Sequence, residues 1–320
     1  MSKIKITDAE YKNYGKCKVL SNGLFEMFVT VDVGPRIIKL NLSNKENLMF
    51  NDIDREMQVD VSSVFGEDKE DKKDKNWFIY GGHRLWVSPE DMPRTYYPDN
   101  EPVDVKINGG KILFTPPPQK VNGLQHSIEI EISENQPKAK VTHKIVNVGD
   151  TDITGAIWAL SVMAPGGTVI CPQPDEDTGL LGNRCIALWA YTKLTDIRAN
   201  FFDRYITVKQ DKNISDKFKF GINNTKGWLA YQNHGQIFKK TYEPNHPDGN
   251  YPDWGMSTEV FTNHLFAEAE TLSELKTLKK GDFITHTETW ELIDASCEPD
   301  VDFKRGEEDK VEEYVKKYII

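Results

Sequence analysis

The chain has 320 residues, with 50 acidic and 40 basic side chains, so its formal net charge is −10 at pH 7. This balance argues against a nucleic-acid partner, because affinity for phosphates comes from clustered Lys and Arg. The apolar share of 38% excludes a disordered chain. No stretch reaches the roughly 18 consecutive apolar residues that a membrane-spanning helix requires.

The start of the chain and its cysteines both favour a cytoplasmic protein. The first residues, MSKIKITDAEYKN, lack the apolar core of a signal peptide. The cysteines are widely spaced and form no CxxC pair, which fits reduced thiols. We therefore expect a cytoplasmic protein without a membrane partner.

Alternation of apolar and polar residues with a period of two runs through most of the chain. Ile38, Leu40 and Leu42 alternate with polar residues, as do the isoleucines of 128–132. Turn dipeptides such as Asn22-Gly23 separate these runs. Further strands are expected at 24–31, 103–107, 111–115, 139–148, 205–210, 217–222, 227–232, 236–242, 257–270 and 282–293. The pattern predicts an all-β fold, a large sandwich or barrel, in one domain spanning residues 1–320.

Polar and aromatic residues gather early in the chain, in the segment WFIYGGHRLWVSPE that begins at Trp77. Its paired glycines permit a close backbone approach that can deliver His83 and Arg84 into a cleft. Arg84 beside Trp86 offers a planar donor fork and a flat apolar platform, which suits a polyhydroxylated ligand. The alternative is a structural strand in which His83 and Arg84 only form hydrogen bonds with backbone carbonyls and a neighbouring acid. Arg36, after Gly34-Pro35, could likewise point inward or lie on the surface.

The late segment STEVFTNHLFAEAETLSELK places two carboxylates close together. If 260–270 is one strand, His264, Phe266, Glu268 and Glu270 share a face, and the two carboxylates lie about 7 Å apart. Ionised together they repel, which raises at least one pKa and suits proton transfer. For Glu270, a solvated face is the simpler interpretation.

Other candidates carry less information. Asp253 and Trp254 close a proline-rich loop at 244–254, where Trp254 could be a sugar platform or a loop anchor. Trp158 is interpreted as a core residue. No dinucleotide, nucleotide or serine-hydrolase motif occurs, and no histidine pair has metal-ligand spacing, so we expect neither a cofactor nor a metal. At the end, apolar residues recur at helical spacing and predict a short helix within 306–320.

Taken together, these segments resemble the galactose mutarotase-like superfamily and, within it, the uncharacterised DUF4380-type group. The resemblance runs through NGLFEMFVTVDVGPRIIKLNL, YGGHRLWVSPED, AIWALSVMAPGGTVICPQP, GWLAYQNHGQIFKK, YPDWGMSTEVFTNHLFAEAETLSELKTLKKGD and HTETWELI. It implies a β-supersandwich of two large antiparallel sheets with a concave cleft that holds a carbohydrate.

The resemblance also implies a reaction. In aldose 1-epimerases, a late Glu removes the proton of the anomeric hydroxyl while a His protonates the ring oxygen, so the ring opens and recloses. The late Glu matches Glu268, and the Arg and Gly-Gly elements match Arg36 and Gly81-Gly82 loosely. The mid-chain histidine has no counterpart in AIWALSVMA. Either His83 supplies that proton from another strand, or the protein binds sugar without turning it over.

The sequence therefore predicts an aldose 1-epimerase-like isomerase that acts on a small-molecule carbohydrate. One alternative is a non-catalytic carbohydrate-binding protein. The other is a glycoside hydrolase or lyase, with Glu90 and Glu268 as its carboxyl pair. The expected site consists of a base, an acid and four side chains that position hydroxyls: Glu268, His83, Arg36, Arg84, Trp86 and Asp253.

Overall fold

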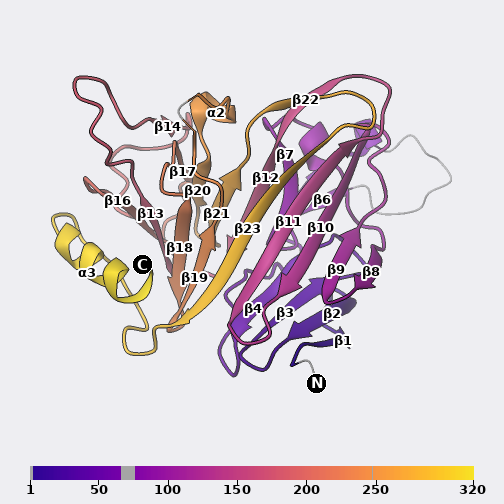
Figure 1. Cartoon of the computed structure of the whole chain (residues 1–320), viewed down its shortest axis with the longest axis horizontal. Helices are drawn as coiled ribbons and strands as arrows, with labels where there is room; N and C mark the ends of the chain where they lie inside the picture. The colour runs from indigo at the N-terminus through magenta and orange to yellow at the C-terminus, as the bar shows by residue number, and fades with distance from the viewer. Residues whose placement is uncertain (1–2, 66–75, 247) are drawn as a thin grey trace.

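The computed structural model describes residues 3–65, 76–246 and 248–320, and most of their regular structure is β. Two large antiparallel sheets, here called sheet I and sheet II, dominate this part of the chain (Figure 1). The prediction of an all-β fold built from large antiparallel sheets is confirmed.

Sheet I has 11 strands. In spatial order they are β1 (Lys5–Glu10), β2 (Lys16–Ser21), β3 (Phe25–Thr30), β4 (Ile37–Leu42), β7 (Gly82–Ser88), β12 (Ile153–Met163), β21 (Ala267–Leu272), β20 (Thr258–Thr262), β17 (Phe218–Ile222) and β14 (Ile186–Leu188), with β22 (Lys276–Leu278) also paired to β12. Its middle strands come from distant parts of the sequence, so residues far apart in the chain become neighbours.

Sheet II has 10 strands. In spatial order they are β15 (Ala199–Phe201), β16 (Tyr205–Lys209), β13 (Thr168–Pro172), β18 (Trp228–Asn233), β19 (Gln236–Thr241), β23 (Phe283–Asp294), β11 (Lys138–Asn147), β10 (Leu124–Ile132), β9 (Lys111–Thr115) and β8 (Asp104–Asn108). The alternation seen in the sequence places one face of β10 and β11 in the core.

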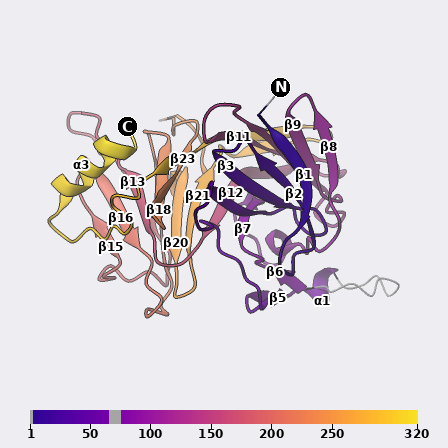
Figure 2. The same cartoon turned by 90° about the horizontal axis from the view of Figure 1, so that it is seen from below.

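The main hydrophobic core lies between the inner faces of the two sheets. Ile157 and Ala159 of β12 belong to it, together with Val141 and Ile145 of β11. A second apolar cluster covers the outer face of sheet I, so β12 and β21 are buried on both faces. A small hairpin-like pair, β5 (Gln58–Asp60) and β6 (Asn76–Phe78), stands beside α1 (Ser62–Phe65) near this outer face (Figure 2).

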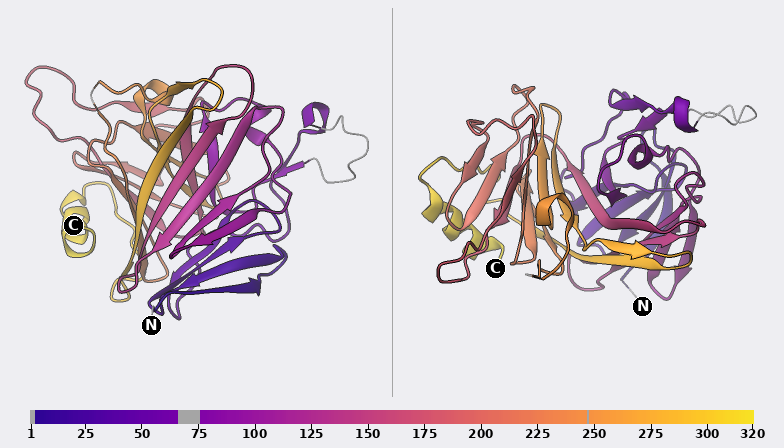
Figure 3. Two further views of the ribbon diagram at one scale, coloured as in Figure 1. Left: turned by 45° about the vertical axis from the view of Figure 1, so that its right-hand side comes forward. Right: turned by 90° about the horizontal axis from the view of Figure 1, so that it is seen from above.

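The helices are short. The predicted C-terminal helix is present as α3 (Glu308–Tyr318), and it buries Val311 and Val315 against Ile170, Ala230 and Ile237 on the outer face of sheet II (Figure 3). Besides α1, the described residues form two further helical turns, the 3₁₀ turn η1 (Arg94–Tyr96) and α2 (Pro252–Gly255). No helix among the described residues is long and apolar enough to cross a membrane.

The expected strand 257–270 is interrupted. The Asn263 side chain accepts hydrogen bonds from the backbone N–H groups of Leu265 and Phe266, which closes a turn between β20 and β21. The turn leaves His264 exposed, away from the strand face on which it was expected. Phe266 is buried in the outer-face cluster.

Candidate functional site

A cavity of about 320 Å³ lies on the outer face of sheet I, a size within the roughly 300–1,000 Å³ of small-molecule sites. Its floor is formed by strands β7, β12 and β21 and its walls by the β5–β6 pair and by residues near β14 and β17. Aromatic side chains make up much of the lining: Trp77, Trp86, Tyr96, Trp158, Trp189, Tyr191, Phe261 and Phe266. Flat apolar rings of this kind can stack on the ring faces of a sugar.

Strand register explains how the polar residues of the floor meet. Arg84 of β7 pairs with Leu160 of β12, and Val162, two residues further on, pairs with Glu268 of β21. Because alternate residues of a strand share a face, Arg84, Trp86 and Glu268 all point to the outer face. Three of the predicted site residues therefore line one cavity.

The central pair of the cavity is Arg84 and Glu268. Arg84 Nη2 lies 3.2 Å from Glu268 Oε1, and its guanidinium sits 4.2 Å from the ring centroid of Trp86. Arg84 Nε and Nη1 are buried and have no hydrogen-bond partner among the described residues. Buried N–H groups are rarely left unpaired, so this guanidinium has two donors available to a ligand.

Burial raises the pKa of Glu268 to about 7, and nearby Glu270 adds to the effect, although Arg84 opposes it. The carboxyl therefore exchanges its proton near neutral pH. A group with such a pKa can serve as a general base or a general acid.

A buried cluster of charges adjoins this pair. Lys219 Nζ lies 2.7 Å from Glu259 Oε2 and 3.2 Å from Glu270 Oε2, and the Trp158 indole N–H donates to Glu270 at 2.7 Å. Burial opposes the charge of Lys219, but Glu259 and Glu270 outweigh it and raise its pKa, so the ammonium persists. Burial raises the pKa of Glu259 well above its usual value, while the nearby Lys219 ammonium opposes that shift.

Two expectations are corrected at this cluster. Glu270 is fully buried, with its Oε2 contacting Trp158 and Lys219, and it does not lie on a solvated face. Trp158, expected in the core, lines the cavity. Strand β12 is apolar on both faces and therefore resembles a core strand in the sequence, whereas β21 carries Glu268 and Glu270 on one face.

His83 does not reach the cavity. It follows the alternation of β7 to the opposite face from Arg84 and is fully buried between the sheets. Its Nδ1 bonds to Ser161 Oγ at 2.8 Å and its Nε2 to His143 Nε2 at 2.7 Å. The pairing of His83 as acid with Glu268 as base is therefore corrected, because a β-sheet separates the two side chains.

The residues around His83 form the one group with metal-ligand geometry in the described ranges. Potential ligand atoms of His83, His143 and Glu288 lie within 4.8 Å of one another. Each imidazole already bonds to protein groups at both nitrogens, and Lys240 Nζ lies 3.0 Å from Glu288 Oε1. The polar atoms of this cluster are thus satisfied within the protein, and its ammonium would repel a cation.

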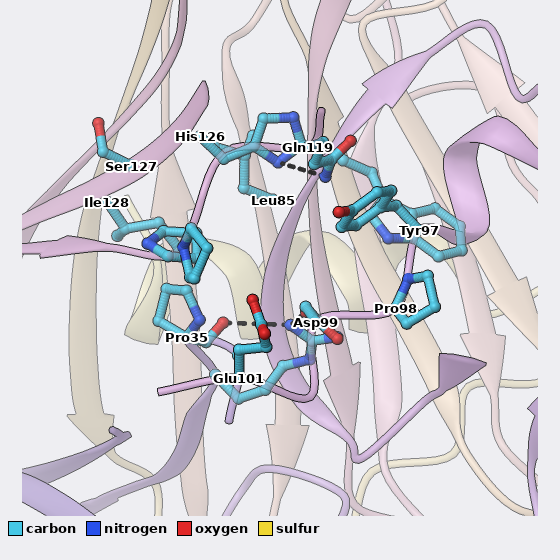
Figure 4. Close-up of a pocket in the computed structure, with 15 residues that line it drawn as sticks. Pro35, Leu85, Tyr97, Pro98, Asp99, Glu101, Gln119, His126, Ser127 and Ile128 are labelled. Atoms are coloured by element: carbon cyan, nitrogen blue, oxygen red, sulfur yellow. Dashed lines mark hydrogen bonds and ion pairs between the residues drawn. The ribbon is translucent and has the colours of Figure 1, made fainter. Parts of the chain in front are cut away.

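Arg36 lies in a different, smaller pocket of about 40 Å³, among Pro35, Tyr97, Asp99 and His126 (Figure 4). Arg36 is buried, donates to Pro35 O at 3.2 Å and forms an ion pair with Asp99. It does not line the cavity of Glu268, so its expected contact with the same sugar is not supported.

Asp253 lies next to the cavity rather than in it. It lines a neighbouring hollow with Trp254 and Trp189, and Trp189 also lines the main cavity. The Ser88 hydroxyl donates to Asp253 Oδ2 at 3.4 Å. Trp254 is 91% exposed, so it is not a buried loop anchor.

Comparisons with solved structures define the fold. A TPR-domain containing protein from Parabacteroides distasonis matches with a TM-score of 0.57 at 12% identity over 87% of this chain, which spans 47% of that protein. A putative aldose 1-epimerase from Klebsiella pneumoniae matches with a TM-score of 0.55 at 13% identity, over 98% of this chain and 87% of that one. A galactose mutarotase-like protein from Clostridium acetobutylicum matches with a TM-score of 0.53 at 11% identity, over 91% and 99%.

The fold of this chain is therefore galactose mutarotase-like, which confirms the predicted β-sandwich of large antiparallel sheets. At such low identity the likeness defines the fold alone. No protein-family model and no curated protein matches the sequence. The narrower assignment to the DUF4380-type group stays a prediction.

Proposed function

We propose that the protein binds a carbohydrate in the cavity on sheet I and acts on it as an aldose 1-epimerase-like isomerase. The observation that carries this proposal is the Arg84–Glu268 pair, a titrating carboxyl beside two free donors inside an aromatic cavity. Trp86 and the other rings would contact the apolar faces of the sugar, and Arg84 would hold hydroxyls. The names mutarotase and aldose 1-epimerase among the similar structures support the same class.

In this proposal, ionised Glu268 removes the proton from the anomeric hydroxyl. The bond from the anomeric carbon to the ring oxygen breaks, a carbonyl forms, and the ring oxygen takes up a proton from an acid. Rotation and reclosure then give the other anomer. Glu268 suits the first step because its pKa of about 7 makes it a stronger base than an exposed carboxylate.

The test is NMR exchange spectroscopy between α and β anomers over a panel of aldoses. We expect one sugar to exchange faster with wild-type protein, at a rate that depends on pH near 7, where Glu268 gains or loses its proton. Glu268→Gln should lower the acceleration by about 10²–10⁴-fold. Glu131→Gln, at an exposed position of sheet II, is the control and should leave it unchanged. Retention of the full rate by Glu268→Gln would refute this role.

Two alternatives have observations in their favour. No histidine lines the cavity in the described ranges, which favours a carbohydrate-binding protein without catalysis. Glu90 and Glu268 line the same cavity, which favours a glycoside hydrolase or lyase. Saturable binding without anomer exchange would support the first alternative. Release of the leaving group from an aryl glycoside would support the second.

A further inference from the structure

We infer that Glu90 is the second proton-transfer group of the cavity and that Tyr96 positions it. The inference rests on the proposed isomerase function, since it names the partner of Glu268 in that reaction. It replaces His83, which lies on the other face of the sheet.

Glu90 is held at the mouth of the cavity by an aromatic support. It follows β7 by two residues, and the Tyr96 hydroxyl donates to its Oε1 at 2.5 Å. The Tyr96 ring packs edge-on against Trp77 and Trp86, with centroid distances of 5.0 Å to each. Because these indoles also form the cavity wall, the position of the Glu90 carboxylate is fixed relative to the floor.

The Glu90 and Glu268 side chains line the same cavity. Burial raises the pKa of Tyr96 and of Tyr191, and both carboxylates add to the increase in each phenol. Both phenols are therefore within electrostatic reach of both carboxylates. A single sugar in this cavity can meet Glu268 from the floor and Glu90 from the mouth.

The reaction needs two proton-transfer groups that share one proton. Ring opening removes a proton from the anomeric oxygen and adds one to the ring oxygen, while the bond from the anomeric carbon to the ring oxygen breaks and a C=O bond forms. Reclosure reverses both transfers at the same two oxygens, so the two carboxyls end with the single proton they began with. No co-reactant is required.

Other ionisable groups of the cavity are less suited to this exchange. The Arg84 guanidinium does not give up a proton in proteins. The Glu259 and Glu270 carboxylates raise the pKa of Lys219, so it stays charged. The phenols of Tyr96 and Tyr191 also have raised pKa values. Glu90 is the other carboxyl that lines this cavity in the described part of the chain.

The experiment compares Glu90→Gln with its matched neighbour Asp91→Asn in the anomer-exchange assay, on the sugar that wild-type protein accelerates. Asp91 is 62% exposed and does not line the cavity. We expect Glu90→Gln to lower the acceleration by about 10²–10⁴-fold with sugar affinity unchanged, and Asp91→Asn to keep it. Tyr96→Phe should lower the turnover rate more than it changes KM.

Chemical rescue separates a proton-transfer role from a structural one. Because Glu90 is exposed at the mouth, formate should reach the space left by Glu90→Ala and restore exchange in proportion to its concentration. If Glu90→Gln keeps the wild-type rate while Glu268→Gln loses it, the inference about Glu90 is overturned and the proposed function stands. If wild-type protein accelerates anomer exchange for none of the sugars, the proposed function itself is refuted, and the role of Glu90 is refuted with it.

Discussion

At the scale of single residues, two buried carboxyl groups of this protein have pKa values that are shifted in opposite directions. Burial favours the protonated form of both Glu268 and Glu288. Glu288 nevertheless has its pKa lowered to about 2, because the Lys240 ammonium lies 3.0 Å from it and the Thr271 hydroxyl donates to it. Within the described ranges Glu268 has a single donor, Arg84, and its pKa rises to about 7. Hydrogen-bond donors, rather than burial alone, thus decide which carboxylate can exchange protons.

A prediction at this scale concerns His126, whose pKa burial lowers to about 4. The unfolded chain binds a proton at this histidine near pH 6.5, so the contribution to stability is complete above that pH. It is lost as the pH falls from about 6.5 toward 4. Urea denaturation should show that His126→Gln loses about 2 kcal/mol less than wild type between pH 7.5 and 4.5.

Exposed His264 supplies the control for this measurement. His264→Gln should lose stability with acid as wild type does. An equal loss in wild type and in His126→Gln would contradict the prediction.

Two neighbouring residues show what could have been predicted about the site. Alternation along a strand places His83 and Arg84 on opposite faces, so they cannot serve one cleft, and this was available from the sequence. The sequence did not indicate which of these two residues shares a face with Glu268. That depends on the register of β12 against β7 and β21, which pair across long sequence separations.

At the scale of elements, strands with one solvent-exposed face could be predicted from the sequence. Strands that are buried on both faces were harder to interpret. β10 shows clean alternation, and its prediction at 128–132 is confirmed within Leu124–Ile132. β12 is buried at nine of its positions in a row, from Gly155 to Met163, because the outer-face cluster covers it. Its Trp158 therefore resembles core in the sequence although it lines the cavity.

Helix α3 offers a test at this scale. Tyr314 is buried against Phe303, and its hydroxyl has no hydrogen-bond partner among the described residues. Removing only the hydroxyl removes an unsatisfied polar group, so Tyr314→Phe should be neutral or stabilise the protein by about 1 kcal/mol. Tyr314→Ala should destabilise it by about 3 kcal/mol, because a cavity forms under the helix.

Thermal and urea denaturation of both variants check the prediction for α3. A loss of more than about 1 kcal/mol in Tyr314→Phe would mean that the hydroxyl is satisfied in solution, for example by water. A negligible loss in Tyr314→Ala would mean that α3 does not stay docked on sheet II.

At the scale of the whole molecule, a polar connection crosses the hydrophobic core between the sheets. Lys240 extends from sheet II and donates to the carbonyl oxygens of Ala269 and Ala159 in sheet I, at 3.0 and 3.4 Å. It also pairs with Glu288 of its own sheet at 3.0 Å. Since all three partners lie in the dry interior, this lysine fixes how one sheet sits on the other. Alternation along β19 places Lys239 and Lys240 on opposite faces, but the sequence alone does not indicate which of the two is buried.

The last prediction tests this connection. Lys240→Met leaves Glu288 buried without its cation, and should cost about 3–5 kcal/mol of unfolding free energy. Adding Glu288→Gln removes the unpaired charge, while the amide can still accept from Thr271 or Trp290. The double variant should therefore be more stable than Lys240→Met alone, although it carries one change more. Strictly additive losses in urea denaturation would show that the two groups do not depend on each other, and that apolar packing alone holds the sheets in register.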